Sequence, residues 1–87
     1  MNIYRRDKNL MLRKDKDGYI ILNGDRAYML NETAAKVLKL CDGKKNLNDI
    51  RDQICIMYNI DECKDIQLDI EEILNQFIDY KLISIIN

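Results

Sequence analysis

The hydrophobic pattern of the chain changes its period between Leu30 and Asn31, and this change constrains the fold more than any other feature. Before it, short apolar runs are separated by turn-forming residues, a pattern typical of β-strands. After it, Ala34, Val37 and Leu38 have the spacings that place them on one face of a helix. Asn31 supplies a side-chain oxygen that can accept a hydrogen bond from the first free N–H groups of that helix. The pattern therefore predicts a strand that leads directly into a helix.

Three short strands are predicted before the change of period. They cover Leu10–Arg13, Tyr19–Leu22 and Arg26–Leu30. An Asp-Gly and an Asn-Gly dipeptide separate the runs, and both dipeptides are strong signals for tight hairpin turns. We therefore expect an antiparallel meander in which Arg26–Leu30 forms one edge. Residues 1–8 are polar and charged and are expected to be flexible, so the single domain is predicted over residues 9–87.

Three amphipathic helices are predicted after the change of period. They cover about Glu32–Asp42, about Leu47–Tyr58 after an Asn46–Asp49 capping box, and a last stretch from Glu62 or Asp65 to Tyr80. Gly43 is expected to stop the first helix, and Leu82–Ile86 is a closing strand or a packed tail. The buried positions are predicted to be Val37, Leu38, Ile50, Ile54, Ile70, Leu74 and Phe77. The predicted fold class is α+β: a three-stranded antiparallel sheet followed by a three-helix bundle that resembles a winged helix-turn-helix.

The length and the distribution of apolar residues limit where the chain can act. Its 87 residues are enough for one domain with a small core. No apolar run approaches the roughly 20 residues that a membrane-spanning helix needs. The first residues lack the apolar segment of a secretory signal. No membrane association is expected, and the expected location is the cytoplasm.

The residue types that carry most enzymatic chemistry are scarce in this chain. Histidine is absent, which removes the commonest general base and a common metal ligand. The three cysteines, Cys41, Cys55 and Cys63, match no zinc or redox spacing, and buried free thiols are favoured for the first two. No serine elbow, phosphate-binding glycine loop or metal motif is present. The chain is therefore not expected to be an enzyme, and no cofactor, metal or catalytic residue is predicted.

The helix-turn-helix character of the last two helices raises DNA binding as an alternative function. Residues 1–45 carry 11 basic and 6 acidic side chains, whereas residues 46–87 carry 3 basic and 9 acidic ones. DNA affinity depends mostly on cations that meet phosphates. The last helix would have to be the recognition helix, and it is acidic. Nucleic acid is therefore not the expected partner, and a small winged-helix DNA-binding regulator is kept as the alternative.

Peptide binding agrees better with the predicted sheet. An edge strand at Arg26–Leu30 offers unpaired N–H and C=O groups that an extended peptide can complete. A loop, a helix or a second copy of the chain could cover the same edge, so a homodimer is also open. On the last helix Leu68 lies outside the apolar stripe, beside a polar flank that would suit one wall of a groove. The flank consists of Asp65, Asp69, Glu72 and Gln76.

Two sequence blocks resemble the PqqD family. They are Leu30-Asn31-x-Thr33-Ala34-Ala35 and Leu38-x-Leu40-Cys41-Asp42-Gly43. The resemblance continues through Ile50, Ile54, Tyr58, Asp69-Ile70 and Leu74 to Leu82-Ile83. Two departures are visible: Lys81 stands where the family usually has glycine, and the loop over residues 60–69 is slightly longer.

The resemblance to PqqD implies a non-catalytic peptide chaperone. Such proteins bind the leader of a ribosomally made precursor peptide and present the precursor to a modifying enzyme, such as a radical SAM protein or a leader protease. The leader adds as a strand to the third strand and packs against the third helix. The edge would be formed by Arg26, Ala27, Tyr28, Met29 and Leu30, and the opposing wall by Asp65, Leu68, Asp69, Glu72, Ile73 and Gln76. Asp69 and Glu72 are expected to pair with a basic leader residue, and Arg26 with an acidic one.

Overall fold

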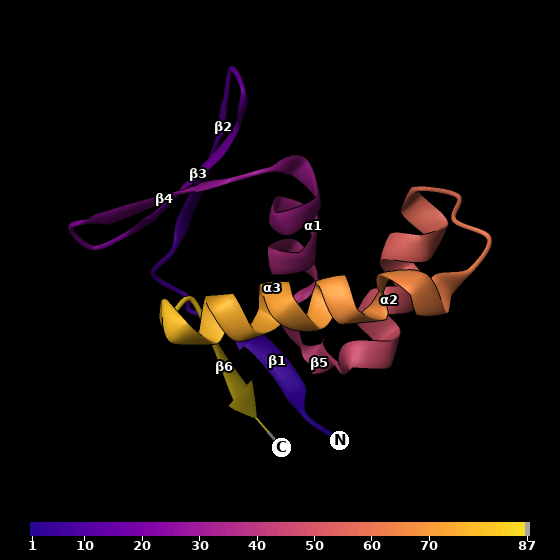
Figure 1. Cartoon of the computed structure of the whole chain (residues 1–87). Helices are drawn as coiled ribbons and strands as arrows, with labels where there is room; N and C mark the ends of the chain where they lie inside the picture. The colour runs from indigo at the N-terminus through magenta and orange to yellow at the C-terminus, as the bar shows by residue number, and fades with distance from the viewer. Residues whose placement is uncertain (87) are drawn as a thin grey trace.

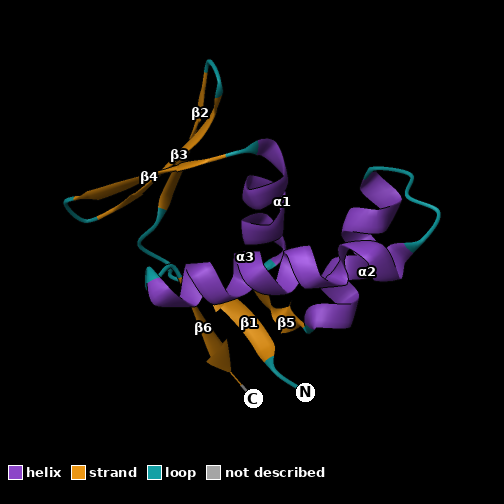
Figure 2. Cartoon of the chain, viewed as in Figure 1, coloured by secondary structure: helices purple, strands orange, loops and turns teal. Residues whose placement is uncertain are grey.

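The computed structural model describes residues 1–86, which form two three-stranded antiparallel sheets, three α-helices and a short 3₁₀ helix (Figure 1). The elements in chain order are β1 (Ile3–Arg6), β2 (Met11–Asp15), β3 (Gly18–Asn23), β4 (Arg26–Leu30), α1 (Glu32–Leu40), β5 (Asp42–Lys45), α2 (Leu47–Met57), the 3₁₀ helix η1 (Cys63–Ile66), α3 (Gln67–Asp79) and β6 (Ile83–Ile86). One sheet has the order β2-β3-β4 and the other β5-β1-β6. α1 leads from the first sheet into the second (Figure 2).

The sheet β2-β3-β4 is the meander that the sequence predicted. Its register pairs Asp15 with Gly18 and Asn23 with Arg26, so each connection is a two-residue turn. Gly18 has a φ of +154°, and a Cβ there would lie 2.7 Å from the carbonyl oxygen of Leu30. The first turn therefore requires glycine at that position. β4 is an edge strand, as predicted.

The second sheet differs from the sequence prediction. Residues 1–8 were expected to be flexible, but Ile3–Arg6 forms β1, the central strand between β5 and β6. β5 lies between α1 and α2 in the chain, so the order is not one sheet followed by three helices. Neither β1 nor β5 has a strong apolar pattern of its own, and both depend on pairing with partners distant in sequence. The closing strand predicted within Leu82–Ile86 is present as β6.

Side-chain caps fix where the first two helices begin. The Asn31 side-chain oxygen accepts a hydrogen bond from the Ala34 N–H at 2.8 Å. Asn46 and Asp49 form the predicted capping box, because each side chain accepts from the other's backbone N–H, at 2.9 and 3.1 Å. The change of period at Leu30 and Asn31 therefore marks a true strand-to-helix junction.

Two helix ends differ from the predicted ones. α1 ends at Leu40 rather than at Asp42, because Asp42 already belongs to β5. Gly43 has a φ of +85° but lies inside β5, so it does not stop the helix. α3 begins at Gln67, and the preceding residues from Cys63 form the tighter η1.

The core joins the three helices to both sheets. All seven positions predicted to be buried are at most 2% exposed, namely Val37, Leu38, Ile50, Ile54, Ile70, Leu74 and Phe77. Ile21 of β3 and Leu82, next to β6, belong to the same cluster. The helical face of the core was therefore predictable from spacing alone.

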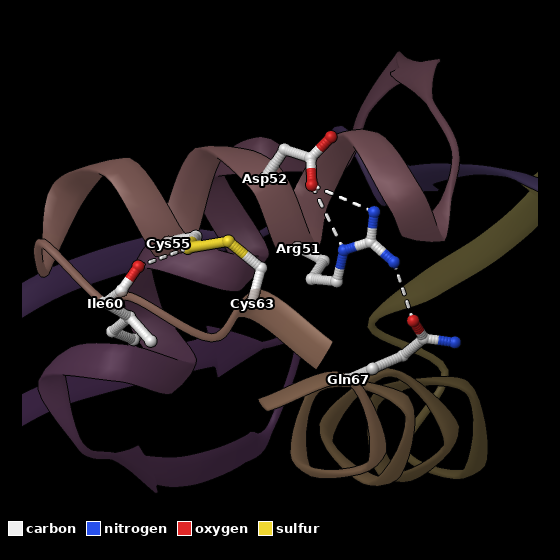
Figure 3. The surroundings of a disulfide bond; sticks show 6 residues. All are labelled: Arg51, Asp52, Cys55, Ile60, Cys63 and Gln67. Atoms are coloured by element: carbon white, nitrogen blue, oxygen red, sulfur yellow. Dashed lines mark hydrogen bonds and ion pairs between the residues drawn. A yellow bond between two sulfur atoms is a disulfide. The ribbon is translucent and has the colours of Figure 1, made fainter. Parts of the chain in front are cut away.

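The cysteines correct one prediction. Cys55 was expected to be a free thiol, but it forms a disulfide with Cys63 (Figure 3). The Cys55 sulfur also lies 2.9 Å from the Ile60 carbonyl oxygen. Cys41 is free and buried as predicted, and its burial raises the pKa of its thiol to about 12. The disulfide ties the end of α2 to the segment that leads into α3.

Candidate functional site

The outer edge of β4 is open to an extended segment. In a two-residue hairpin the residues that flank the turn form a hydrogen-bonded pair, so Arg26, Tyr28 and Leu30 direct their N–H and C=O groups toward β3. Ala27 and Met29 alternate with them and therefore direct these groups away from β3. No strand within residues 1–86 pairs with this side of β4. Backbone groups of Ala27 and Met29 are thus available to a further strand.

The side chains of β4 alternate between the two faces of the sheet. Leu30 is buried and Tyr28 half-buried, whereas Met29 is 65% exposed on the opposite face. The Tyr28 ring stacks on the ring of Tyr80, which directly follows α3, with ring centroids 4.5 Å apart. The Gln76 side-chain amide donates a hydrogen bond to the Tyr80 hydroxyl at 3.2 Å. Tyr28 and Tyr80 therefore hold β4 against the C-terminal end of α3.

One flank of α3 lies nearest to β4. At about 100° per residue, Asp69, Ile73, Gln76 and Tyr80 share this flank. Because Tyr80 stacks on Tyr28, the flank as a whole faces the β4 side of the helix. The sequence prediction included the first three residues and missed Tyr80. The spacing of four, three and four residues along this flank is the signal that could have found it.

Three predicted wall residues lie outside the flank of α3 that is next to β4. Asp65 is exposed and belongs to η1 rather than to α3. Leu68 is 68% exposed, as predicted, and points nearly opposite to the buried residues Ile70 and Phe77. Glu72 lies between the direction of Leu68 and the flank next to β4. The structure therefore brings Asp69, Ile73 and Gln76 closest to the β4 side and leaves Leu68 farther around the helix.

A shallow depression of about 490 Å³ runs along the exposed face of α3. Its lining residues are Asp69, Glu72, Ile73, Asn75, Gln76 and Asp79. The three carboxylates in this set take part in none of the ion pairs that the described residues form. Their negative charge is therefore available to a cationic partner group.

Arg26 supplies the opposite charge at the start of β4. Its side chain is exposed, and hydrogen bonding with Tyr28, followed by the nearby Asp25 carboxylate, raises the pKa of its guanidinium. An arginine guanidinium stays protonated in proteins, so Arg26 is a cation. The edge of β4 and the face of α3 carry opposite charges, which would orient a bound segment that has charges of both signs.

Residues 1–86 provide neither a metal-binding cluster nor a membrane-spanning helix. No three His, Cys, Asp or Glu side chains of this part of the chain are grouped closely enough to hold a metal ion. None of its helices is long and apolar enough to cross a membrane.

The fold is shared with three solved structures. The solution NMR structure of the PqqD truncation of Methylobacterium extorquens PqqCD, described as a functional, stand-alone RiPP recognition element, superposes with a TM-score of 0.77 at 24% identity and covers 93% of this chain and 87% of that one. Lasso peptide synthetase B1 complexed with the leader peptide gives 0.73 at 18% identity, covering 94% and 98%. TbiB1 in complex with the TbiA(beta) leader peptide gives 0.74 at 16% identity, covering 92% and 94%. At these identities the likeness defines the fold class.

Sequence comparison defines the family. The family of coenzyme PQQ synthesis protein D (PqqD) matches residues 18–83, and the chain belongs to it. A PqqA binding protein from Methylococcus capsulatus is 41% identical over 56 residues, which cover 64% of this chain. The matched part spans 57% of that relative's length. The family predicted from the two sequence blocks is thereby confirmed.

Proposed function

We propose that this protein recognises the leader of a ribosomally made precursor peptide, without catalysis of its own, and presents the precursor to a modifying enzyme. The observation that carries the proposal is the open edge of β4 beside the flank of α3. Membership of the PqqD family supports it, as do a relative named for binding PqqA and two solved domains of the same fold in complex with leader peptides.

The leader would bind as an extra strand on β4. Its main chain would pair with the outward backbone groups of Ala27 and Met29, while Arg26, Tyr28 and Leu30 keep their bonds to β3. Side chains on one face of the bound strand would contact Ile73 and the Tyr80 ring. The half-buried Ile73 gives this wall its apolar character.

Charge would set the direction of the bound leader. Asp69 and Glu72 would pair with a basic leader residue, and Arg26 would pair with an acidic one. Asp65 and Leu68 would extend the wall toward the N-terminal end of α3, where the polypeptide leaves the disulfide-linked loop. The partner enzyme would be a radical SAM protein or a leader protease that acts on the exposed part of the precursor.

A proline substitution tests strand addition at the edge. Ala27→Pro removes one outward N–H but no hydrogen bond to β3, so the fold should be kept. Lys14→Pro is the matched control, because Lys14 has the equivalent outward position on β2, the other edge of this sheet. Titration calorimetry with the leader of a neighbouring precursor gene should show affinity reduced by about tenfold or more in Ala27→Pro, the loss of roughly one net hydrogen bond and its neighbours. Lys14→Pro should bind as the unmodified protein does.

Backbone amide NMR with the same leader locates the binding site on the protein. Shifts concentrated at Arg26–Leu30 and along Asp65–Tyr80 would support the site. If both proline variants bound the leader with equal affinity and the amide shifts lay outside β4, then β4 would not be part of the site. Shifts with duplex DNA on the basic N-terminal half, and none with the leader, would instead support the winged-helix regulator.

A further inference from the structure

A second cleft, built from other residues, lies at the junction of β1, β6 and the end of α3. Its volume is about 680 Å³, and its lining residues are Arg5, Arg6, Asp7, Lys8, Ile78, Lys81, Ile83 and Ser84. None of these residues belongs to the edge of β4 or to the α3 flank described above. The cleft is therefore a separate feature of the surface.

The cleft carries uncompensated positive charge. Arg5, Lys8 and Lys81 take part in none of the ion pairs formed within residues 1–86. Arg6 is held in place because its guanidinium donates to the carbonyl oxygens of Lys39 at 2.8 Å and Cys41 at 3.3 Å. The single carboxylate in the lining, Asp7, accepts a hydrogen bond from the backbone N–H of Asn9 at 3.0 Å. The net charge of the cleft favours an anionic ligand.

The backbone at Lys81 is unfavourable for lysine. Its φ of +61° lies in the left-handed region, directly after the α3 C-cap. The N–H of Lys81 donates to the Ile78 carbonyl at 3.0 Å and that of Leu82 to the Phe77 carbonyl at 2.9 Å, which is a Schellman motif with lysine at the glycine position. A non-glycine residue is strained in this conformation, because its Cβ comes too close to the following carbonyl oxygen. The two Schellman hydrogen bonds hold this strained conformation, and the side chain of Lys81 lines the cleft.

The cleft borders a second open sheet edge. The Asp7 N–H donates to the Leu82 carbonyl at 2.8 Å, and the Arg6 N–H donates to the Cys41 carbonyl at 2.8 Å. Along an antiparallel pair the residues point their backbone groups alternately toward the partner strand and away from it. Because Leu82 directs its carbonyl toward β1, Ile83 and Ile85 of β6 direct their backbone groups away from β1. β6 is an edge strand within the described chain. An extended segment could therefore pair with β6 beside the cations.

We propose that this cleft binds an acidic, extended peptide segment of a partner protein. The carboxylates of the peptide would pair with Arg5, Lys8 and Lys81, and its backbone would pair with β6. The cations come from three separate places, namely β1, the loop after β1 and the residue after the α3 C-cap, which suits a chain of carboxylates better than one compact anion. Ile78 and Ile83 supply apolar contact between the charges. The site is independent of the β4 edge, so both could be occupied at once.

Fluorescence anisotropy with short peptides tests this site. The probes are a labelled eight-residue peptide that alternates Glu and Val, and the same peptide with Lys in place of Glu. The Glu peptide should bind with an affinity that falls as salt is added, and the Lys peptide should not bind. Lys81→Gly should weaken binding of the Glu peptide about fivefold, the effect of one ion pair, while it raises thermal stability. Lys16→Gly, which removes a lysine from the β2–β3 turn, is the matched control and should leave binding unchanged.

Other occupants give distinguishable results. Equal binding of both peptides, or an unchanged affinity in Lys81→Gly, would overturn the proposal. Displacement of the Glu peptide by inorganic phosphate at equal concentration would indicate a small-anion site instead. Sedimentation equilibrium would detect reversible self-association of the protein. If Lys81→Gly and Asp79→Asn each abolished it, the occupant would be the acidic α3 face of a second copy. Leader binding should be normal in Lys81→Gly, so failure of this site and failure of the β4 site can be told apart.

Discussion

Reduction of the Cys55–Cys63 disulfide should lower the free energy of unfolding by about 2.5 kcal/mol. The two cysteines are 8 positions apart in the chain. Opening the bond frees a loop of about nine residues in the unfolded state, and the chain-entropy relation gives about 2.5 kcal/mol for that length at 25 °C. A small domain has a total stability of about 5–15 kcal/mol, so this loss would be easy to measure.

The folded state should survive reduction because other contacts join the same elements. Arg51 of α2 donates to the side-chain oxygen of Gln67 at the start of α3 at 2.7 Å (Figure 3). The Ile60 N–H donates to the Cys55 carbonyl at 3.0 Å. The effect should therefore appear as a lower urea midpoint, with little change in the folded-state circular dichroism spectrum.

Urea unfolding with and without a phosphine reductant measures the effect. A variant with serine at both Cys55 and Cys63 should be as unstable as the reduced protein and should not respond to reductant. Cys41 should stay unlabelled by an alkylating reagent in the folded protein, because it is buried and its thiol pKa is raised to about 12. If the reductant exposes two alkylatable thiols yet changes the unfolding free energy by less than about 0.5 kcal/mol, the loop argument is refuted.

Three further predictions concern single residues. Phe77→Ala should lower the unfolding free energy by about 3–5 kcal/mol in urea titrations, since the ring is 1% exposed, and a near-normal midpoint would contradict the core assignment. Leu68→Ala should leave stability unchanged and weaken leader binding in calorimetry. The loss of affinity should be smaller than in Tyr80→Ala, because Tyr80 lies on the flank next to β4. A larger loss in Leu68→Ala than in Tyr80→Ala would place the leader on the outer face of α3. The hydrogen bond from Lys45 lowers the pKa of the Asp42 carboxyl from 3.8. The ionised Asp42 therefore stabilises the folded state fully above pH 3.8, and this stabilisation is lost as pH falls through the lowered pKa. Asp42→Asn should remove this part of the acid-unfolding profile.

The predictable parts of the fold are those determined by local sequence. Asn31 follows a strand pattern and precedes a helical one, so the junction of β4 and α1 could be placed from capping chemistry. The turn dipeptides fixed the order of β2, β3 and β4 and hence the edge position of β4. The buried face of each helix followed from spacings of three and four.

The parts that could not be predicted depend on contacts between distant residues. β5 consists of Asp-Gly-Lys-Lys and is a strand only because β1 pairs with it. The disulfide required the end of α2 and η1 to come together, which their sequence separation did not indicate. Tyr80 joined the candidate site through stacking on Tyr28, a contact made only when α3 packs beside β4. The predicted wall lacked Tyr80 for this reason, and the wall itself stays a prediction.

The pairing of the first and last strands has a consequence for how this domain can be attached to other proteins. Ile3 of β1 lies opposite Ile86 of β6, so the two ends of the described chain leave the fold at the same place. The candidate leader site lies on the other sheet. A fusion partner could be tethered at either end, or the whole domain inserted into a surface loop of an enzyme, with both linkers short and the open edge of β4 still facing solvent.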